Sequence, residues 1–182
     1  MHAKHVIIIN QLTKANESYG YDLIKGDFVA PLGKGMVSDM TITYSGEKID
    51  AWHFNSKANV KFSNAGDGLI VFQKNKETSE YKSAYQAPLS GYVKERDITN
   101  GRNGIGTAQT GNADSNNNYY FRIRTVLGSD GSVESAYYGK IYGEFPNFTY
   151  YLNPTPNDRN VEFDTSKNLF KITDRDEEVS EP

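Results

Sequence analysis

Short runs of alternating hydrophobic and polar residues occupy most of the chain, which is the pattern of β-strands with one buried face. Residues 6–9 are apolar and β-branched, and they predict a buried strand over 5–12. Glycine, asparagine and proline separate the runs, as they do at turns between antiparallel strands. Further strands are expected over 21–30, 37–44, 49–54, 60–62, 69–72, 119–127, 133–145 and 148–152.

The most regular pattern is a hairpin in the second half of the chain. Phe121 and Ile123 fall on one face of its first strand, and Arg122 and Arg124 fall on the other. Residues 128–131 read Gly-Ser-Asp-Gly and predict a tight turn. In the returning strand Gly139 lies among aromatic residues, where a ring from the neighbouring strand is expected to cover it.

Other segments depart from alternation. Tyr81, Ala84 and Tyr85 have helical spacing and predict one short helix over 76–87. Residues 45–48 are expected to form a turn and residues 161–163 a short edge strand. The stretch 99–118 is rich in Gly and Asn, with Ile105 as its one large apolar residue, and it predicts a long flexible loop.

These elements predict an all-β, mainly antiparallel fold with at most one short helix. Uneven strand and loop lengths favour a sandwich over a barrel. We expect one sandwich domain over 1–173, followed by an acidic, disordered tail over 174–182.

Composition narrows the range of functions. The net charge is −3 with scattered basic residues, which gives no electrostatic basis for binding nucleic acid. The chain has no cysteine, which excludes disulfides and thiol chemistry, and no apolar run long enough for a membrane helix. The start, Met-His-Ala, is typical of a vector remnant, so we expect that an export signal was removed before residue 1.

Several motifs suggest chemistry, but each is incomplete. Residues 114–118 begin like a calcium loop, yet Tyr119 and Thr125 stand where that loop needs a glycine and an acid. Gly101, Gly104 and Gly106 lack the helix and lysine of a phosphate-binding loop. We therefore predict no metal and no cofactor.

Catalytic arrangements are equally incomplete. His53 is the one histidine away from the N-terminal His2 and His5, and no nucleophile motif accompanies it. Glu144 is the best candidate for an acid of a hydrolytic pair, but no partner acid is evident. We therefore predict no catalytic residue, with a small hydrolase as a third hypothesis.

Aromatic side chains are the remaining candidates, since the chain has 13 Tyr, 9 Phe and 1 Trp. Trp52, Tyr138 and Tyr142 are predicted to form an interaction surface. The same residue types also suit cross-strand packing in the core, a protein interface or stacking on a sugar ring. All three alternatives stay open at this point.

Two segments carry a resemblance to a known group of proteins. Residues 135–143 read SAYYGKIYG, and residues 150–164 read YYLNPTPNDRNVEFD before the Asn-Leu-Phe of 168–170. These segments resemble secreted or outer-membrane proteins found with type IV pilus assembly components in mucus-dwelling bacteria. The resemblance implies an immunoglobulin-like sandwich and a role in pilus function or adhesion. It brings no catalytic residues, and the chain lacks the long apolar N-terminal helix of pilin subunits.

The function expected from the sequence is thus a non-enzymatic, secreted, periplasmic or outer-membrane-associated sandwich. Its partners would be proteins, such as pilus components or a host surface. The alternative is a carbohydrate-binding module that uses surface aromatics.

Overall fold

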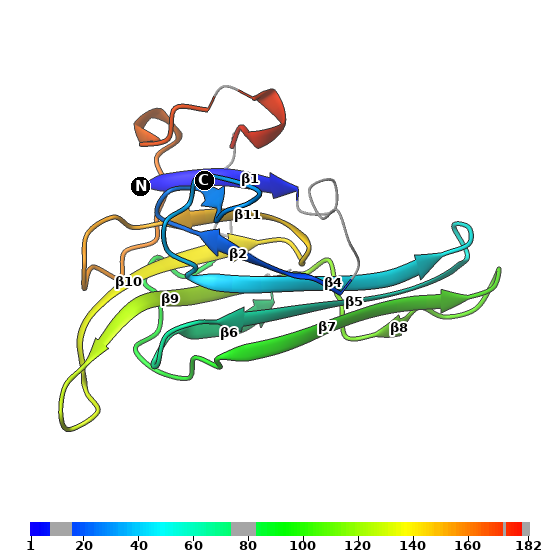
Figure 1. Ribbon diagram of the computed structural model, residues 1–182, viewed down its shortest axis with the longest axis horizontal. Helices are drawn as coiled ribbons and strands as arrows, with labels where there is room; N and C mark the ends of the chain where they lie inside the picture. The colour runs from blue at the N-terminus through cyan, green and yellow to red at the C-terminus, as the bar shows by residue number, and fades with distance from the viewer. Residues whose placement is uncertain (8–15, 74–82, 173, 180–182) are drawn as a thin grey trace.

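The computed structural model of the chain describes residues 1–7, 16–73, 83–172 and 174–179 (Figure 1). Two antiparallel sheets lie face to face and form a sandwich, as the sequence predicts. Predictions that fall on 8–15, 74–82, 173 and 180–182 lie outside the described residues.

The first sheet contains five strands in the order β1-β11-β10-β9-β6. Strands β9, β10 and β11 form a meander, while β1 pairs with β11 and β6 pairs with β9. The strands are β1 (His2–Ile7), β6 (Gly68–Gln73), β9 (Asn117–Leu127), β10 (Val133–Tyr142) and β11 (Asn147–Leu152).

The second sheet contains six strands in the order β3-β2-β4-β5-β7-β8. Its three long strands, β4, β5 and β7, are paired along nearly their whole length. The strands are β2 (Ser18–Asp22), β3 (Asp27–Phe28), β4 (Met40–Lys48), β5 (His53–Phe62), β7 (Glu95–Asn103) and β8 (Thr110–Gly111).

The core lies between the two sheets and is built from alternate residues of each strand. Phe121 and Tyr150 of the first sheet and Phe62 and Ile42 of the second are completely buried. Gly139 makes this packing possible, because a Cβ atom there would overlap the ring of Phe121. This confirms the prediction that a ring from the neighbouring strand covers Gly139.

The outer face of the first sheet is also covered. Segments 83–93 and 153–163 cross it and bury Tyr120, Tyr138 and Ala136 together with Val161. Arg122 lies over the ring of Tyr92, with its Cζ 4.7 Å from the ring centroid. Because both faces of this sheet are packed, residues 117–123 and Thr125 of β9 are buried.

A backbone connection and an ion-pair network are among the contacts that join the two sheets. Val93 pairs with Leu69 of β6, and one residue later the Lys94 carbonyl accepts a hydrogen bond from the Phe62 amide of β5. At the same end, Arg124 of β9 reaches across to the second sheet. Its Nη2 lies 2.9 Å from Asp22 Oδ1, and its Nε lies 2.8 Å from Asp39 Oδ1.

In the ion-pair network of Arg124, the pKa values of the two acids, Asp22 and Asp39, shift in opposite directions. Burial opposes ionisation of Asp22, but the amides of Lys25, Met36 and Val37 and the charge of Arg124 lower its pKa. Burial raises the pKa of Asp39, although Arg124 partly offsets this. The network therefore joins the sheets through buried charges that depend on one another.

Several predicted boundaries are wrong. Residues 45–48 are not a turn, because Gly46 pairs with Ser56 and β4 continues to Lys48. Residues 99–118 are not one loop, because 99–103 belong to β7 and 110–111 form β8. Residues 161–163 are not a strand, although the Val161 amide donates to the Tyr85 carbonyl.

The predicted helix over 76–87 is not found in its described part, residues 83–87. This part is not helical, and Gln86 forms a β-bridge with Asn160. In this part, pairing with a segment distant in sequence therefore overrides the helical preference that the spacing of the aromatic and alanine residues suggests.

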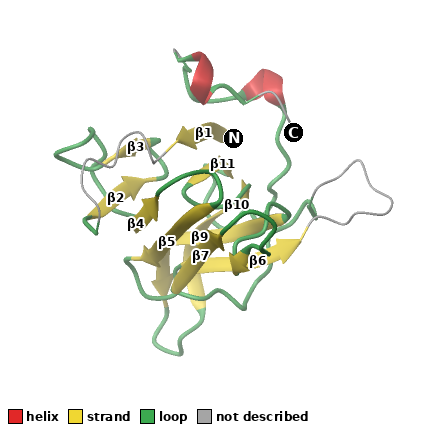
Figure 2. Cartoon of the chain, turned by 90° about the vertical axis from the view of Figure 1, so that its right-hand side faces the viewer, coloured by secondary structure: helices red, strands yellow, loops and turns green. Residues whose placement is uncertain are grey.

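The C-terminal segment passes beside β1, and Figure 2 shows its two short 3-10 turns at that end of the molecule. These are η1 (Thr165–Lys167) and η2 (Arg175–Glu177). Lys4 Nζ lies 2.9 Å from Glu177 Oε1, which ties the acidic segment to the sandwich.

Candidate functional site

The long strands β4, β5 and β7 of the second sheet, together with the short β8, form a protrusion, which we call the finger. It consists of residues 45–57 of β4 and β5 with their loop, and residues 99–111 of β7, β8 and their turn. Figure 1 shows the finger projecting to one side of the molecule. Its strands are paired without interruption. In the β4–β5 pair, Ser45 lies opposite Lys57 and Lys48 lies opposite Phe54. In the β5–β7 pair, His53 lies opposite Asn103.

Asp50 orders the loop between β4 and β5. Its Oδ1 accepts hydrogen bonds from the amides of Trp52 at 2.6 Å and His53 at 2.8 Å. The His53 ring adds a contact of 2.9 Å between its Nδ1 and Asp50 Oδ2. The Trp52 amide and the His53 side chain lower the pKa of Asp50, so its carboxylate is ionised when it holds the loop.

A second turn follows β7 and is bonded to the first. The Gly104 amide donates to the Trp52 carbonyl at 2.8 Å, and the Gly104 carbonyl accepts from the amide and hydroxyl of Thr107. Gly104 and Gly106 have φ values of 125° and 78°, which favour glycine. The two turns therefore form one end of the finger, which we call the tip.

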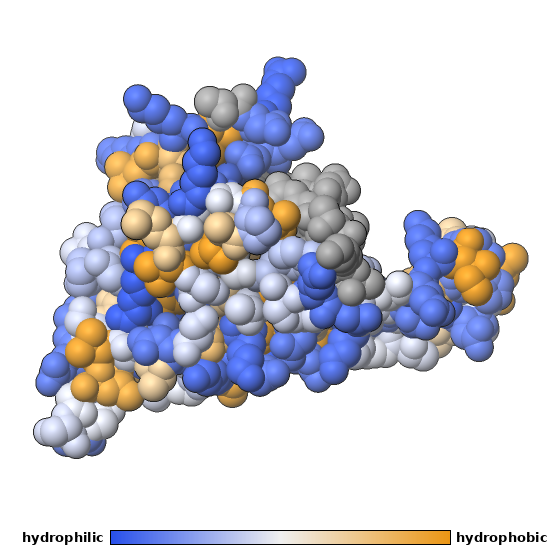
Figure 3. All heavy atoms as spheres, in the orientation of Figure 1, coloured by the Kyte–Doolittle hydropathy of each residue, from blue (hydrophilic) through white to orange (hydrophobic). Residues whose placement is uncertain are grey.

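The tip exposes apolar side chains. Ile49 is 84% exposed and Ile105 is 78% exposed, one from each turn. Trp52, in the turn between β4 and β5, is 40% exposed, and the guanidinium Cζ of Arg102 lies 4.4 Å from its ring centroid. Figure 3 shows apolar atoms gathered at the far end of the protrusion, surrounded by polar ones.

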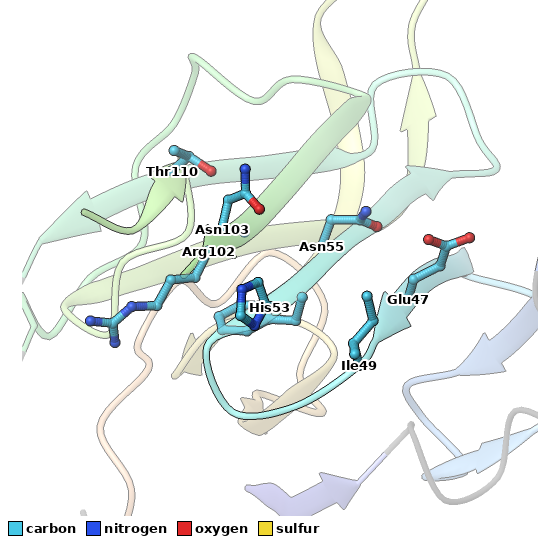
Figure 4. Close-up of a pocket in the computed structure, with 9 residues that line it drawn as sticks. Glu47, Ile49, His53, Asn55, Arg102, Asn103 and Thr110 are labelled. Atoms are coloured by element: carbon cyan, nitrogen blue, oxygen red, sulfur yellow. The ribbon is translucent and has the colours of Figure 1, made fainter. Parts of the chain in front are cut away.

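A shallow hollow lies just behind the tip, on one face of the finger, and Ile49 lines it together with polar side chains (Figure 4). It has a volume of about 260 Å³. Glu47 is the one carboxylate among the described residues that line it. The other polar lining side chains are those of His53, Asn55, Arg102, Asn103 and Thr110.

The predicted aromatic surface is not brought together. Trp52 is at the tip, but Tyr138 is only 3% exposed and packs under segment 83–93. Tyr142 is half-buried, and its ring packs against Tyr151. Trp52, Tyr138 and Tyr142 do not form one surface, because Tyr138 is buried and Tyr142 lies in β10 of the first sheet, whereas Trp52 lies in the loop between β4 and β5 of the second.

Glu144 is engaged by several donors. Its carboxylate accepts hydrogen bonds from the Tyr119 hydroxyl, from Asn117 Nδ2 at 2.8 Å and from the Asp114 amide at 3.3 Å. Burial and the bond to Glu144 raise the pKa of the Tyr119 hydroxyl. The arrangement fixes the start of β9 against the turn after β10, which favours a structural role for Glu144.

The other motifs are used within the fold. Asp114 Oδ1 accepts from the amide and side chain of Asn116, and Asn118 Oδ1 accepts from the Gly143 amide. His2 packs on Phe170, and burial lowers its pKa. In the described part of the chain, His, Asp and Glu side chains form no group of three that could hold a metal ion.

Two asparagines cover strand edges. Asn112 Oδ1 accepts from the Thr99 amide of β7 at 2.7 Å, and its Nδ2 donates to the Asp97 carbonyl. Asn168 does the same for Ala3 of β1. Its Oδ1 accepts from the Ala3 amide at 3.1 Å, and its Nδ2 donates to the Ala3 carbonyl at 2.8 Å. These contacts occupy backbone groups that an added strand would need, so they disfavour strand addition there.

Sequence reasoning found Trp52 but missed Ile49 and Ile105 as site residues. The available signal was the position of each isoleucine. Ile105 is the one large apolar residue in a stretch of glycine, asparagine and small polar residues, and Ile49 lies between Lys48 and Asp50. Nothing in the local sequence indicates that the two turns meet.

The fold and the site define an all-β sandwich that carries an apolar-tipped finger. Within the described residues, no helix has the length and hydropathy needed to cross a membrane. No family model matches the chain, and neither a curated protein nor a solved structure gives a significant match.

Proposed function

We propose that the protein is a non-enzymatic attachment module that binds a cell surface through the tip of its finger. The observation that carries this proposal is the exposure of Ile49 and Ile105 at the end of an ordered protrusion. Clustered, exposed apolar side chains on a polar rim are typical of binding sites. Trp and Arg, which meet here as Trp52 and Arg102, are the residue types enriched at the centres of interfaces.

Order in the tip supports the same proposal. Asp50, Gly104 and Thr107 bond the two turns before any partner arrives, so little conformational entropy is lost on binding. A role beside a pilus is part of the proposal. It rests on the resemblance of residues 135–170 alone, and labelled protein on piliated and non-piliated cells tests it.

Binding to cells tests the function directly. The tip variant carries Ile49→Ser and Ile105→Ser. The body variant carries Met36→Ser and Leu89→Ser, whose side chains are 81% and 67% exposed on the sandwich. Fluorescently labelled protein is applied to piliated bacteria and to cultured epithelial cells.

We expect the tip variant to lose binding and the body variant to keep it, with equal melting temperatures for both. Equal binding by the two variants would refute the finger as the attachment element. The sugar-binding alternative has only one exposed ring, Trp52, at the tip. Binding of the wild type to a glycan array, with no binding by Trp52→Ala, would support the sugar-binding alternative.

A further inference from the structure

We propose that the tip inserts into the interface of a lipid bilayer with electrically neutral headgroups. This inference rests on the proposed function and names the chemistry of the surface that the finger attaches to. Its first argument is shape. Ile49 and Ile105 project from two turns at the end of a protrusion, so the apolar surface is convex. A fluid interface accommodates a convex apolar tip, whereas a protein must offer a matching cavity.

The second argument is the order of side chains along the finger. The two isoleucines lie in the turns, and Trp52, in the same turn as Ile49, has the guanidinium of Arg102 on its ring. Tryptophan favours the headgroup level of a bilayer, where its ring is buried and its N–H remains hydrated. Arg102 and Lys48 have long apolar stems and can keep their charges among the headgroups.

The third argument is the state of the tip backbone. A polar backbone group that enters lipid without a partner is costly. The amides of Trp52 and His53 donate to Asp50, and the Ile49 amide donates to the His53 carbonyl at 2.9 Å. The Trp52 carbonyl accepts from Gly104. These bonds within the tip lower the cost of leaving water.

The fourth argument is charge. Around the tip, Glu47 and Asp50 balance Lys48 and Arg102. Anionic lipids attract surfaces that are rich in basic residues, and this tip has no basic excess. A neutral headgroup, such as phosphatidylcholine, is therefore the predicted surface, and binding should not depend on salt.

Flotation with phosphatidylcholine vesicles tests the inference. Trp52 is the one tryptophan in the chain, so its emission reports on the tip alone. We expect the wild type to float with the vesicles and its emission to shift to the blue. Each isoleucine replaced in the tip variant should lower partitioning by about tenfold. The body variant should float like the wild type, and melting temperatures should be unchanged without vesicles.

Three results would overturn the inference: no flotation of the wild type, equal flotation of the tip variant, or binding that requires anionic lipid and falls with salt. The cell-binding test separates the two proposals. If cells bind the wild type and not the tip variant while vesicles bind neither, the target is a protein or glycan, and only the lipid inference fails. If cells bind both variants equally, the proposed function itself fails.

Discussion

The body of the sandwich and the finger use the same sheet in opposite ways. Within the body, alternate residues of β4 and β5 such as Ile42 and Val60 are completely buried against the first sheet. Toward the tip the same strands carry half-buried or exposed residues, and Ile49 in the loop between them is 84% exposed. The buried packing therefore lies in the body, and in the proposed function the finger supplies the binding surface.

The contrast extends to charges. In the body, Arg124 is paired with two acids whose side chains are each 1% exposed. Toward the finger, Lys57 pairs with Asp97 at 2.8 Å, but both side chains are about half exposed. Buried pairs depend strongly on both partners, and exposed pairs contribute little. Substitutions in the two regions should thus affect different measurements.

The largest expected effect on the body is alkaline unfolding. Burial raises the pKa values of Tyr21, Tyr119, Tyr150 and Tyr151 above the ordinary value of 10. The folded state therefore holds these protons more tightly than the unfolded state. The resulting stability is complete below pH 10 and is lost as pH rises above it. At pH 11 the loss should be about 6 kcal/mol for these four tyrosines, at about 1.4 kcal/mol each.

Tyrosine ionisation measured by ultraviolet absorbance, together with circular dichroism, checks this prediction. The four buried tyrosines should ionise only as the strands unfold. Ionisation of all 13 tyrosines with the circular dichroism unchanged would contradict it.

The next largest effect is expected from removing the charge that joins the sheets. Arg124→Met leaves Asp22 and Asp39 buried without their cation and should lower the free energy of unfolding by about 3 kcal/mol. Urea denaturation measures this. Lys57→Met, which breaks the exposed pair with Asp97, should cost less than about 1 kcal/mol. Equal losses of unfolding free energy for the two variants would contradict the distinction between the buried ion pairs of the body and the exposed pair near the finger.

Two glycine substitutions, one in the body and one at the tip, should cause smaller losses of stability that also differ between the two regions. Gly139→Ala forces a Cβ atom into the Phe121 ring and should cost about 1–3 kcal/mol. Gly106→Ala at the tip meets no atom within 4 Å and loses only the freedom of a positive φ, about 1 kcal/mol. Thermal unfolding of the two variants should rank them in this order, and the reverse ranking would contradict the packing described for β10.

The smallest expected effect on stability is at Asp50. Asp50→Ala removes the acceptor for the Trp52 and His53 amides and should lower the free energy of unfolding only slightly, since the loop is exposed. Its effect on cell binding should be larger, because the loop is no longer held in place. Asp50→Asn keeps an acceptor oxygen and should bind better than Asp50→Ala. Identical binding by both would show that the order of the loop is unimportant.

Much of the sandwich could be predicted from sequence, because alternation is strong where one strand face is buried. The hairpin of β9 and β10 and the cover over Gly139 follow from local pattern. The errors arise where turn-forming residues lie inside paired strands. Gly46 and residues 99–103 look like turn and loop, yet β5 pairs with both.

The site was only partly predictable for a related reason. Trp52 stood out by its type, but Tyr138 and Tyr142 are equally aromatic and lie on a covered face. Which face of a sheet is covered depends on segments 83–93 and 153–163, whose positions no local pattern gives. The meeting of the two turns at Trp52 and Gly104 likewise requires the register of β5 and β7.

Site-specific photo-crosslinking tests the central claim most directly. A photoreactive phenylalanine analogue is placed at position 49, at the tip, or at position 36, on the body, and the folded protein is irradiated on cells. The account predicts an adduct with a cell-surface component from position 49 and none from position 36. Adducts of equal yield from both positions, or from position 36 alone, would contradict it.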